Sequence, residues 1–454
     1  MKKILIPFLG LLLCALLQAQ TMQTSYFSED FTYSYRMNPA FHPSYSFVGL
    51  PVIGSSSFAY TGAFTLGDVF YKSGGERVTF MNDDIQSSDF LGRFKEGLNN
   101  FNIEHYTNLL AIGFEAGGMY NIVDLNVRSY GSGKLPYDLM RYLKEGASTD
   151  GSYDLSGMNA HLSSMMEIGI TSSWKPNRKM RIGMRFKGVI GLSNSYINMD
   201  RMNISHTGDN WKVTSSGVIA SAYDGLGIKT RPSSFDPTVQ LLDLRNTEVG
   251  KSKGIMNGYG VGADVGIFYD DSSWQYSVSI SDIGCVFWFH NLYGHSPSQA
   301  SEYVVSYQRH GNKDTRMKNE FADMGDLMGD ALNFVKEDEY QSLGMLPLTA
   351  RFGAKYLYLS DLSFGGLATF RYDDICPYWD VRGNVIYKPV KKVELIGSLG
   401  VGTYGVTAGA FANAKLGFVN IFLGTDALLG MRSSNFLFPG TRNPNLAFGM
   451  NIIW

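Results

Sequence analysis

The sequence predicts an all-β protein, a transmembrane antiparallel β-barrel of about 14 strands, within a range of about 12–16, with a few helices in long loops. Among its 454 residues are 51 glycines, aromatic residues make up 14%, and charged residues only 18%. Apolar and polar residues alternate along much of the chain, as in strands with one apolar face. After the N-terminal leader, no apolar stretch reaches the roughly 18 residues of a helical span. Since only helices and closed barrels satisfy their backbone groups in lipid, a barrel is indicated.

The N-terminus has the pattern of a secretory signal peptide. Lys2 and Lys3 form a basic start, an apolar run extends from Ile4 to Leu17, and Leu17-Gln18-Ala19 is a small-residue cleavage site. We therefore expect residues 1–19 to be a signal peptide, residues 20–44 an N-terminal segment, and residues 45–454 the barrel. Such a chain is exported, and a barrel of this kind belongs in the outer membrane of a Gram-negative bacterium.

The clearest alternation lies in residues 179–192, where the even positions are apolar and several odd positions are cationic. A cation facing lipid near the midplane costs about 2–4 kcal/mol, so the cationic face must point into the lumen. The C-terminal third repeats this pattern. The cations predicted to line the lumen on this basis are Arg181, Arg185, Lys187, Arg351, Lys355 and Arg371.

Two interpretations of these cations remain open at this stage. They either line a wet lumen, or they pair with carboxylates such as Glu167, Asp264 and Glu394 inside a plugged barrel. A lumen for acyl chains should be apolar with at most a cation or two, so the cationic faces count against fatty-acid transport.

The last residues of the chain carry a pattern typical of barrel assembly. Every second residue back from the C-terminus is large and apolar, and the chain ends on an aromatic residue: Phe448, Met450, Ile452 and Trp454. We expect this strand to be the signal that the barrel assembly machinery reads, and its apolar face to contact outer-membrane lipid.

Three loops have apolar residues at helical spacing, in residues 88–99, 136–146 and 322–339. Each is expected to be a loop helix that caps the barrel mouth by its apolar stripe. A partner-binding or gating helix is the alternative, favoured most for residues 322–339, where the stripe contains methionines and the opposite face is acidic.

The tripeptide Asn38-Pro39-Ala40 stands between the short N-terminal segment and the first predicted strand. This placement resembles the long-chain fatty-acid transporter family of outer-membrane barrels and related Bacteroidetes barrels, including type IX secretion subunits. The whole organisation is most similar to an uncharacterised Bacteroidetes barrel family in that group. The resemblance implies that residues 20–44 form a hatch inside the barrel, with Asn38, Pro39 and Ala40 near the lumen. An ordinary turn before the first strand is the alternative.

The resemblance and the barrel size together predict passage or capture of a small hydrophobic or amphipathic ligand. The alternative is a non-transporting scaffold that docks an envelope protein partner in secretion or envelope assembly. The expected partners are thus outer-membrane lipid, the assembly machinery, and either a hydrophobic ligand or an envelope protein, with no nucleic acid.

Enzyme chemistry is not expected, and neither are catalytic residues, metal sites or cofactors. The stretch from Gly400 to Gly405 matches the G-x-G-x-x-G fingerprint, but no helix is predicted after it. The seven histidines show no metal-ligand spacing. Cys285 and Cys376, the two cysteines after the signal peptide, are too few for a disulfide framework, and whether they pair is left open.

Overall fold

The computed structural model describes residues 22–145, 151–207, 210–232, 237–250, 254, 256–296, 301–303, 334–337, 340–403, 405–429 and 445–454. The predicted signal peptide, residues 1–19, lies outside the described residues. Within them, 14 strands, the first of which is in two pieces, close into one antiparallel barrel. This confirms the predicted fold class.

The ring begins with a strand in two pieces, β1 (Phe47–Gly49) and β2 (Ser56–Gly62), and both pieces pair with the last strand, β25 (Asn445–Ile453). Phe47 lies opposite Ile453 and Ser56 opposite Phe448, so the register closes the barrel. Between these ends the wall consists of β5 (Leu98–Ala116), β6 (Met119–Pro136), β8 (Asn159–Trp174), β9 (Met180–Thr207), β13 (Gly258–Asp271), β14 (Trp274–His290), β19 (Thr349–Leu357), β20 (Leu362–Arg371), β21 (Tyr378–Val390), β22 (Val393–Gly402), β23 (Gly405–Leu416) and β24 (Val419–Thr425).

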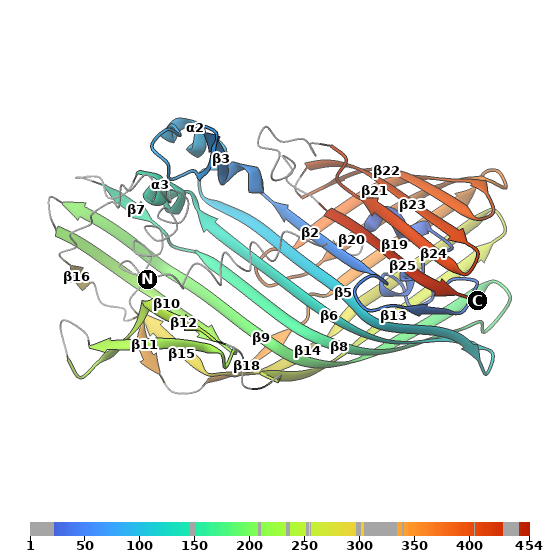
Figure 1. Ribbon diagram of the computed structural model, residues 1–454, viewed down its shortest axis with the longest axis horizontal. Helices are drawn as coiled ribbons and strands as arrows, with labels where there is room; N and C mark the ends of the chain where they lie inside the picture. The colour runs from blue at the N-terminus through green and yellow to red at the C-terminus, as the bar shows by residue number, and fades with distance from the viewer. Residues whose placement is uncertain are drawn as a thin grey trace.

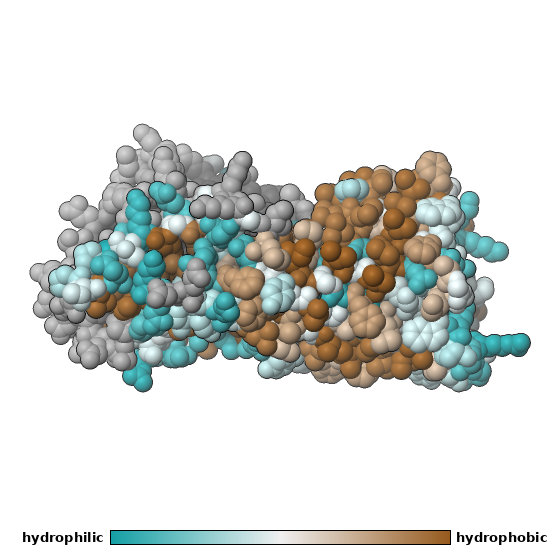
Figure 2. Space-filling view, turned by 90° about the horizontal axis from the view of Figure 1, so that it is seen from below, coloured by the Kyte–Doolittle hydropathy of each residue, from teal (hydrophilic) through white to brown (hydrophobic). Residues whose placement is uncertain are grey.

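The outside of the barrel carries an apolar belt at the end where the C-terminus and the short turns lie (Figures 1 and 2). Along β9, Phe186 is 61% exposed while the neighbouring Arg185 and Lys187 are each 3% exposed. The rings of Trp274 and Tyr356 pack together at the turn end of the belt, with centroids 4.9 Å apart and planes at 42°, as in an interfacial aromatic girdle. This half of the molecule therefore spans the outer membrane, with its short turns on the periplasmic side.

The described residues of the other half of the molecule are more hydrophilic on the face shown, and this half extends beyond the belt (Figure 2). Strand β9 continues into it for a total of 28 residues. Further strands build this outer extension: β7 (Ser152–Asp154), β10 (Asn210–Ser221), β11 (Leu226–Pro232), β12 (Gln240–Val249), β15 (Leu292–Ser296), β16 (Ser301–Tyr303), β17 (Val335–Glu337) and β18 (Tyr340–Met345).

Helices α2 (Ser87–Leu91) and α3 (Tyr137–Glu145), the short helix η3 (Leu66–Asp68) and the hairpin β3 (Phe70–Ser73) and β4 (Glu76–Thr79) belong to this outer extension. Apolar side chains from α2, α3, the hairpin and the outer end of the barrel pack into one buried cluster that contains Phe90, Leu139 and Met202, called here the outer apolar cluster. Among the described residues, none of the helices is long and apolar enough to cross a membrane.

Of the three predicted loop helices, one is present as predicted, one is shorter than predicted, and one is in part a strand. The helix expected in residues 136–146 is α3. The helix expected in residues 88–99 is wrong beyond Leu91, because Gly97 adopts a φ of +92° and Leu98 already begins β5. Of residues 322–339, those up to 333 lie outside the described residues, and Val335–Glu337 form a strand because they pair with β12 and β15.

The N-terminal segment, described from residue 22 to residue 44, lies inside the membrane-spanning half of the barrel (Figure 1). It contains two short 3-10 helices, η1 (Gln23–Phe27) and η2 (Ser34–Arg36), and its aromatic residues pack in a buried cluster with the inner wall. Tyr26, Tyr35 and Asn38 are each 0% exposed. Both Cys285 and Cys376 are free in the described part of the chain.

Candidate functional site

The N-terminal segment fits against the wall because the wall offers glycines where the segment comes close. A Cβ atom added at Gly183 would lie 2.0 Å from the Pro39 carbonyl carbon, and one at Gly266 would lie 1.9 Å from Asn38 Oδ1. The same holds along several other strands, so that six inward-facing glycines form a track: Gly183, Gly266, Gly353, Gly365, Gly409 and Gly424. Any larger side chain there would occupy the space of the segment.

The motif Asn38-Pro39-Ala40 binds β13 and β14 through backbone groups. The Asn38 amide donates hydrogen bonds to the carbonyls of Ile267 and Val278, each at 3.3 Å, and its Oδ1 accepts from the Ala40 N–H at 2.9 Å. Arg181 donates to the Ala40 carbonyl at 3.3 Å. The structure thus places all three motif residues on the inner wall and Arg181 against them.

A second anchor holds the start of the N-terminal segment. It consists of Asp426, directly after β24, and Arg382 on β21. The backbone N–H groups of Gln23 and Thr24 donate to the Asp426 carboxylate at 2.8 and 2.7 Å. Arg382 binds Asp426 at 2.6 Å and Asp380 at 2.7 Å, so the carboxylate that holds the segment is itself held by the wall.

A third anchor lies at the periplasmic mouth. Glu29 forms ion pairs with Lys355 at 2.6 Å and Lys388 at 2.5 Å, and Asp30 pairs with Lys415 at 2.9 Å. Burial raises the pKa of Glu29, but the two lysines outweigh burial and lower the pKa to about 2. Glu29 therefore stays ionised and binds the wall at neutral pH.

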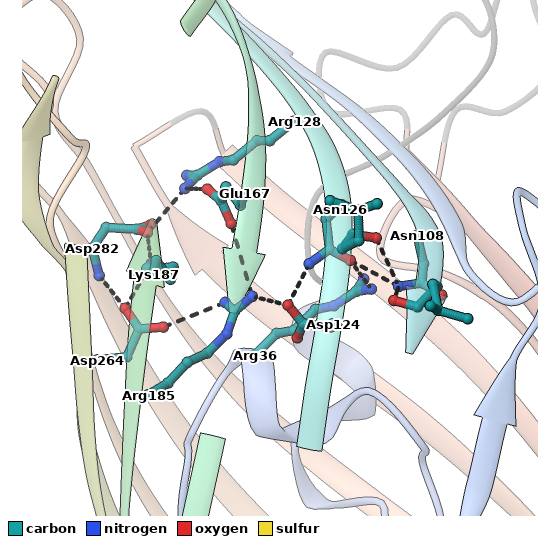
Figure 3. A network of polar contacts seen from close by, with 12 residues as sticks. Arg36, Asn108, Asp124, Asn126, Arg128, Glu167, Arg185, Lys187, Asp264 and Asp282 are labelled. Atoms are coloured by element: carbon teal, nitrogen blue, oxygen red, sulfur yellow. Dashed lines mark hydrogen bonds and ion pairs between the residues drawn. The ribbon is translucent and has the colours of Figure 1, made fainter. Parts of the chain in front are cut away.

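Above these anchors the lumen is crossed by a buried network, called here the ionic layer (Figure 3). Arg185 pairs with Asp124 at 2.8 Å and with Asp264 at 3.5 Å, and Lys187 pairs with Asp264 at 2.7 Å. Charges this deep are tolerated only when they are paired and hydrogen-bonded. The full set is Glu104, Asp124, Arg128, Glu167, Arg185, Lys187, Asp264, Asp282 and Arg371.

Arg36 carries the N-terminal segment into contact with this layer. Its guanidinium lies over the rings of Tyr106 at 3.8 Å and Tyr33 at 4.3 Å, and it donates to Asn126 Oδ1 at 3.2 Å. Asn126 in turn donates to Asp124 at 2.7 Å. The segment and the wall are therefore joined by one continuous set of polar contacts (Figure 3).

The predicted lumen cations do not form a single site. Arg185, Lys187 and Arg371 belong to the ionic layer, Arg181 holds the N-terminal segment, and Lys355 lies at the periplasmic mouth. Arg351 lies beside the layer, with its Nη1 3.5 Å from Ser281 Oγ. Of the carboxylates considered with them, Glu167 and Asp264 are in the layer, and Glu394 lies 3.7 Å from Lys388 at the mouth.

Sequence reasoning missed four of the nine residues of the ionic layer: Glu104, Asp124, Arg128 and Asp282. Asp124 and Arg128 share the inward face of β6 with Asn126, and the alternation of β6 with outward Val123 could have identified all three. Asp282 had no such signal. Regular alternation along β14 would point its side chain outward, but its φ of +66° and the register shift between β13 and β14 break the alternation there.

Two cavities adjoin this network. One, of about 40 Å³, lies in the ionic layer, and the other, of about 50 Å³, lies beside the Asp426 anchor among β2 and β21–β23. Tyr378 lines both cavities.

The terminal strand faces outward. Phe448, Met450 and Ile452 are 38–39% exposed on the lipid side of β25, and Trp454, directly after the strand, is 66% exposed. Their role as an assembly signal stays a prediction.

A family model described as a family of unknown function (DUF5723) matches residues 39–426. No curated protein matched the chain.

Several solved structures are similar in fold. The TodX deltaS2S3 mutant monoaromatic hydrocarbon channel is 10% identical, with a TM-score of 0.43, covering 96% of this chain and 94% of that chain. The P. putida toluene transporter TodX is 8% identical, with a TM-score of 0.40, covering 93% and 92%. A Pseudomonas aeruginosa FadL homologue is 10% identical, with a TM-score of 0.41, covering 96% and 99%. The closed barrel follows from the strand register and does not depend on these similarities.

Proposed function

The chain belongs to a family of unknown function, DUF5723, and from the geometry of its lumen we propose that it passes or captures a small hydrophobic or amphipathic ligand at the outer membrane. The observation that carries this proposal is the position of the N-terminal segment, which fills the lumen between the ionic layer and the periplasmic mouth. Passage then requires the segment to move, so it acts as a hatch.

The contacts of the N-terminal segment suit a hatch that closes the lumen in the absence of ligand. It is held by hydrogen bonds, ion pairs and packing against the glycine track, and each hydrogen bond contributes only about 0.5–1.5 kcal/mol net. Release of the Asn38, Asp426 and Glu29 anchors would free both ends of the segment. A ligand opens such a hatch only if it binds the open form more tightly than the closed form.

The interior supports an amphipathic ligand. The outer apolar cluster supplies apolar side chains at the outer end, and the ionic layer supplies charged groups below it. A wholly apolar ligand would gain nothing from the ionic layer and would have to cross it. Partner docking is not carried further: of the helix predicted in residues 322–339, which favoured it, residues 322–333 lie outside the described residues and Val335–Glu337 form a strand. Export by residues 1–19 stays a prediction.

A disulfide lock tests the hatch. The Thr24 and Ser398 hydroxyl oxygens lie 2.7 Å apart, so Thr24→Cys with Ser398→Cys should join the segment to β22 in a background of Cys285→Ser and Cys376→Ser. We expect oxidised cells to lose uptake of the amphipathic fluorescent dye 11-(dansylamino)undecanoic acid through this protein, and reductant to restore it.

The matched control joins two wall strands instead. Ala410 and Thr425 are a registered pair of β23 and β24, and a disulfide between them should leave uptake unchanged. Equal dye uptake by the oxidised and reduced forms of the Thr24–Ser398 variant would count against a moving hatch.

A further inference from the structure

The inner face of the outer extension carries rows of side chains that cross its strands. Residues directly opposite each other on paired strands point to the same face of a sheet. One such row runs from β6 to β15 and consists of Ser132, His161, Tyr196, Ala220 and Tyr293. On β8, His161 is separated by an even number of residues from Glu167 of the ionic layer, so both side chains point into the lumen. This row therefore faces the lumen on the outer side of the ionic layer.

The part of this face on β8 and β9 is a network of neutral polar groups, called here the outer polar face. It consists of Asn159, His161, Ser163, Asn194, Tyr196 and Asn198, which are paired across the two strands. Asn194 Nδ2 donates to His161 Nε2 at 2.9 Å and to Ser163 Oγ at 2.8 Å. Asn159 Nδ2 donates to Asn198 Oδ1 at 3.1 Å. None of these six side chains is a carboxylate, a lysine or an arginine.

The amides of this face retain hydrogen-bonding groups for a ligand. A side-chain amide has two N–H donors and an oxygen that accepts twice. In the hydrogen bonds between described residues, Asn159 donates once to Asn198, and Asn198 donates once to Asp200 at 3.1 Å. Asn159, Asn198, His161 and Tyr196 are all half-buried, so a molecule in the lumen can contact them.

Tyrosine rings extend the outer polar face on its far side. The rings of Tyr293 and Tyr340 stack with centroids 4.4 Å apart and planes at 22°. His290 connects them to the amides, because its ring lies 5.5 Å from that of Tyr340 and its Nε2 lies 3.4 Å from Asn194 Oδ1. The Tyr196 ring lies 5.7 Å from the His290 ring. Aromatic rings and neutral amides therefore form one continuous surface.

This surface matches the chemistry of a neutral sugar. Each sugar hydroxyl both donates and accepts hydrogen bonds, as the amides do, and the C–H faces of a sugar ring are apolar and pack on aromatic rings. A wholly apolar ligand would leave the amides without hydrogen bonds, which is costly once water is excluded. A charged ligand would meet no opposite charge among the six side chains.

We propose that the outer polar face, with Tyr293 and Tyr340, binds a neutral oligosaccharide, either free or as the head group of a glycolipid. The site lies on the outer side of the ionic layer, away from the N-terminal segment. It goes beyond the proposed function and stands whether or not the segment moves. Locking the segment with the Thr24–Ser398 disulfide should therefore leave sugar binding unchanged.

Native mass spectrometry of the full chain in lauryldimethylamine N-oxide, a detergent without sugar, tests the site. The probes are maltotriose, cellotriose, mannotriose and chitotriose, and we expect one molecule of at least one of them to be retained per chain. Dodecyl maltoside, with dodecylphosphocholine as its control, tests the lipid-borne source. Retention of a free trisaccharide supports a free oligosaccharide as the ligand. Retention of dodecyl maltoside alone, if Asn198→Ala abolishes it, supports a glycolipid head group.

Variants of the face locate the binding. Asn198→Ala should weaken binding of the retained sugar by about threefold to tenfold, as expected for the loss of one neutral hydrogen bond. Tyr293→Ala should weaken it by about tenfold, whereas Tyr293→Phe keeps the stacked ring and should bind nearly as the unmodified chain does. Asn121→Ala, which removes an amide at the periplasmic end of β6, is the matched control and should bind normally.

Folding of each variant is checked by its heat-modifiable migration on gels, and the Tyr293→Phe and Tyr293→Ala pair decides the question if Asn198→Ala does not fold. Two results would overturn the proposal. One is that the unmodified chain retains none of the four trisaccharides and no dodecyl maltoside. The other is that folded Asn198→Ala and Tyr293→Ala retain the sugar as well as the unmodified chain does.

Discussion

Arg185 on β9 and Asp124 on β6 form an ion pair at 2.8 Å although a whole strand, β8, lies between them. The pair forms over Gly169 of β8. A Cβ atom at Gly169 would lie 2.4 Å from Asp124 Oδ1 and 2.7 Å from Arg185 Nη2. The absence of a side chain at this one position thus allows two strands that are not neighbours to share a buried charge pair.

Gly169→Ala should therefore destabilise the barrel. The added methyl group must push the ion pair apart or shift β8, at a cost of about 1–3 kcal/mol. Unfolding in urea, followed by the loss of the fast-migrating folded form on gels, measures this change. Gly188→Ala on β9 is the matched control, because nothing lies within 4 Å of its Cβ position. Equal stability of the two variants would contradict a role for Gly169 in the pair.

A charge on the apolar belt should impair folding. Phe186 is 61% exposed on the lipid face of β9, and Phe186→Lys should cost about 2–4 kcal/mol near the midplane. Phe186→Leu keeps the belt apolar and should fold normally. Folded yield in lipid vesicles distinguishes the two variants. Normal folding of Phe186→Lys would show that this face does not contact lipid.

A larger residue on the glycine track should displace the N-terminal segment. Gly266→Val places side-chain atoms where Asn38 lies, so the Asn38 hydrogen bonds to β13 and β14 cannot form. We expect a higher single-channel conductance in planar bilayers and faster proteolysis of the segment. Gly383→Ala, whose Cβ position is open, serves as the control. Unchanged conductance in Gly266→Val would mean that the segment does not close the lumen.

Acid should loosen the periplasmic anchor. The Glu29 pKa is lowered from 4.5 to about 2, so its contribution to stability is present above pH 4.5 and is lost as pH falls through about 2. Conductance should rise over this window in the unmodified chain. Glu29→Gln, which lacks the charge, should already conduct more at neutral pH and should show a smaller rise. Glu96→Gln, at an exposed acid in the outer extension, should behave like the unmodified chain.

The alternation of residues was enough to predict the fold and its two faces. On β9 the period of two separates Phe186 from Arg185 and Lys187, and this depends only on the backbone geometry of a single strand. The strand number followed from counting the alternating segments and from the even strand number of single-chain barrels. The helix in residues 136–146 was also predictable, because Pro136 and its apolar spacing are local signals.

The partners of the inward residues were decided by the tertiary structure alone. Arg181 and Arg185 look equivalent in the sequence, yet one binds the Ala40 carbonyl and the other binds Asp124 across β8. Asp282 enters the ionic layer only because its backbone leaves the strand conformation. The sequence by itself determined which side chains face inward, since that is set residue by residue. Which of them meet depends on the closure of the ring, the register of its strands and the glycines that let the N-terminal segment inside, and these come from contacts far apart in the chain.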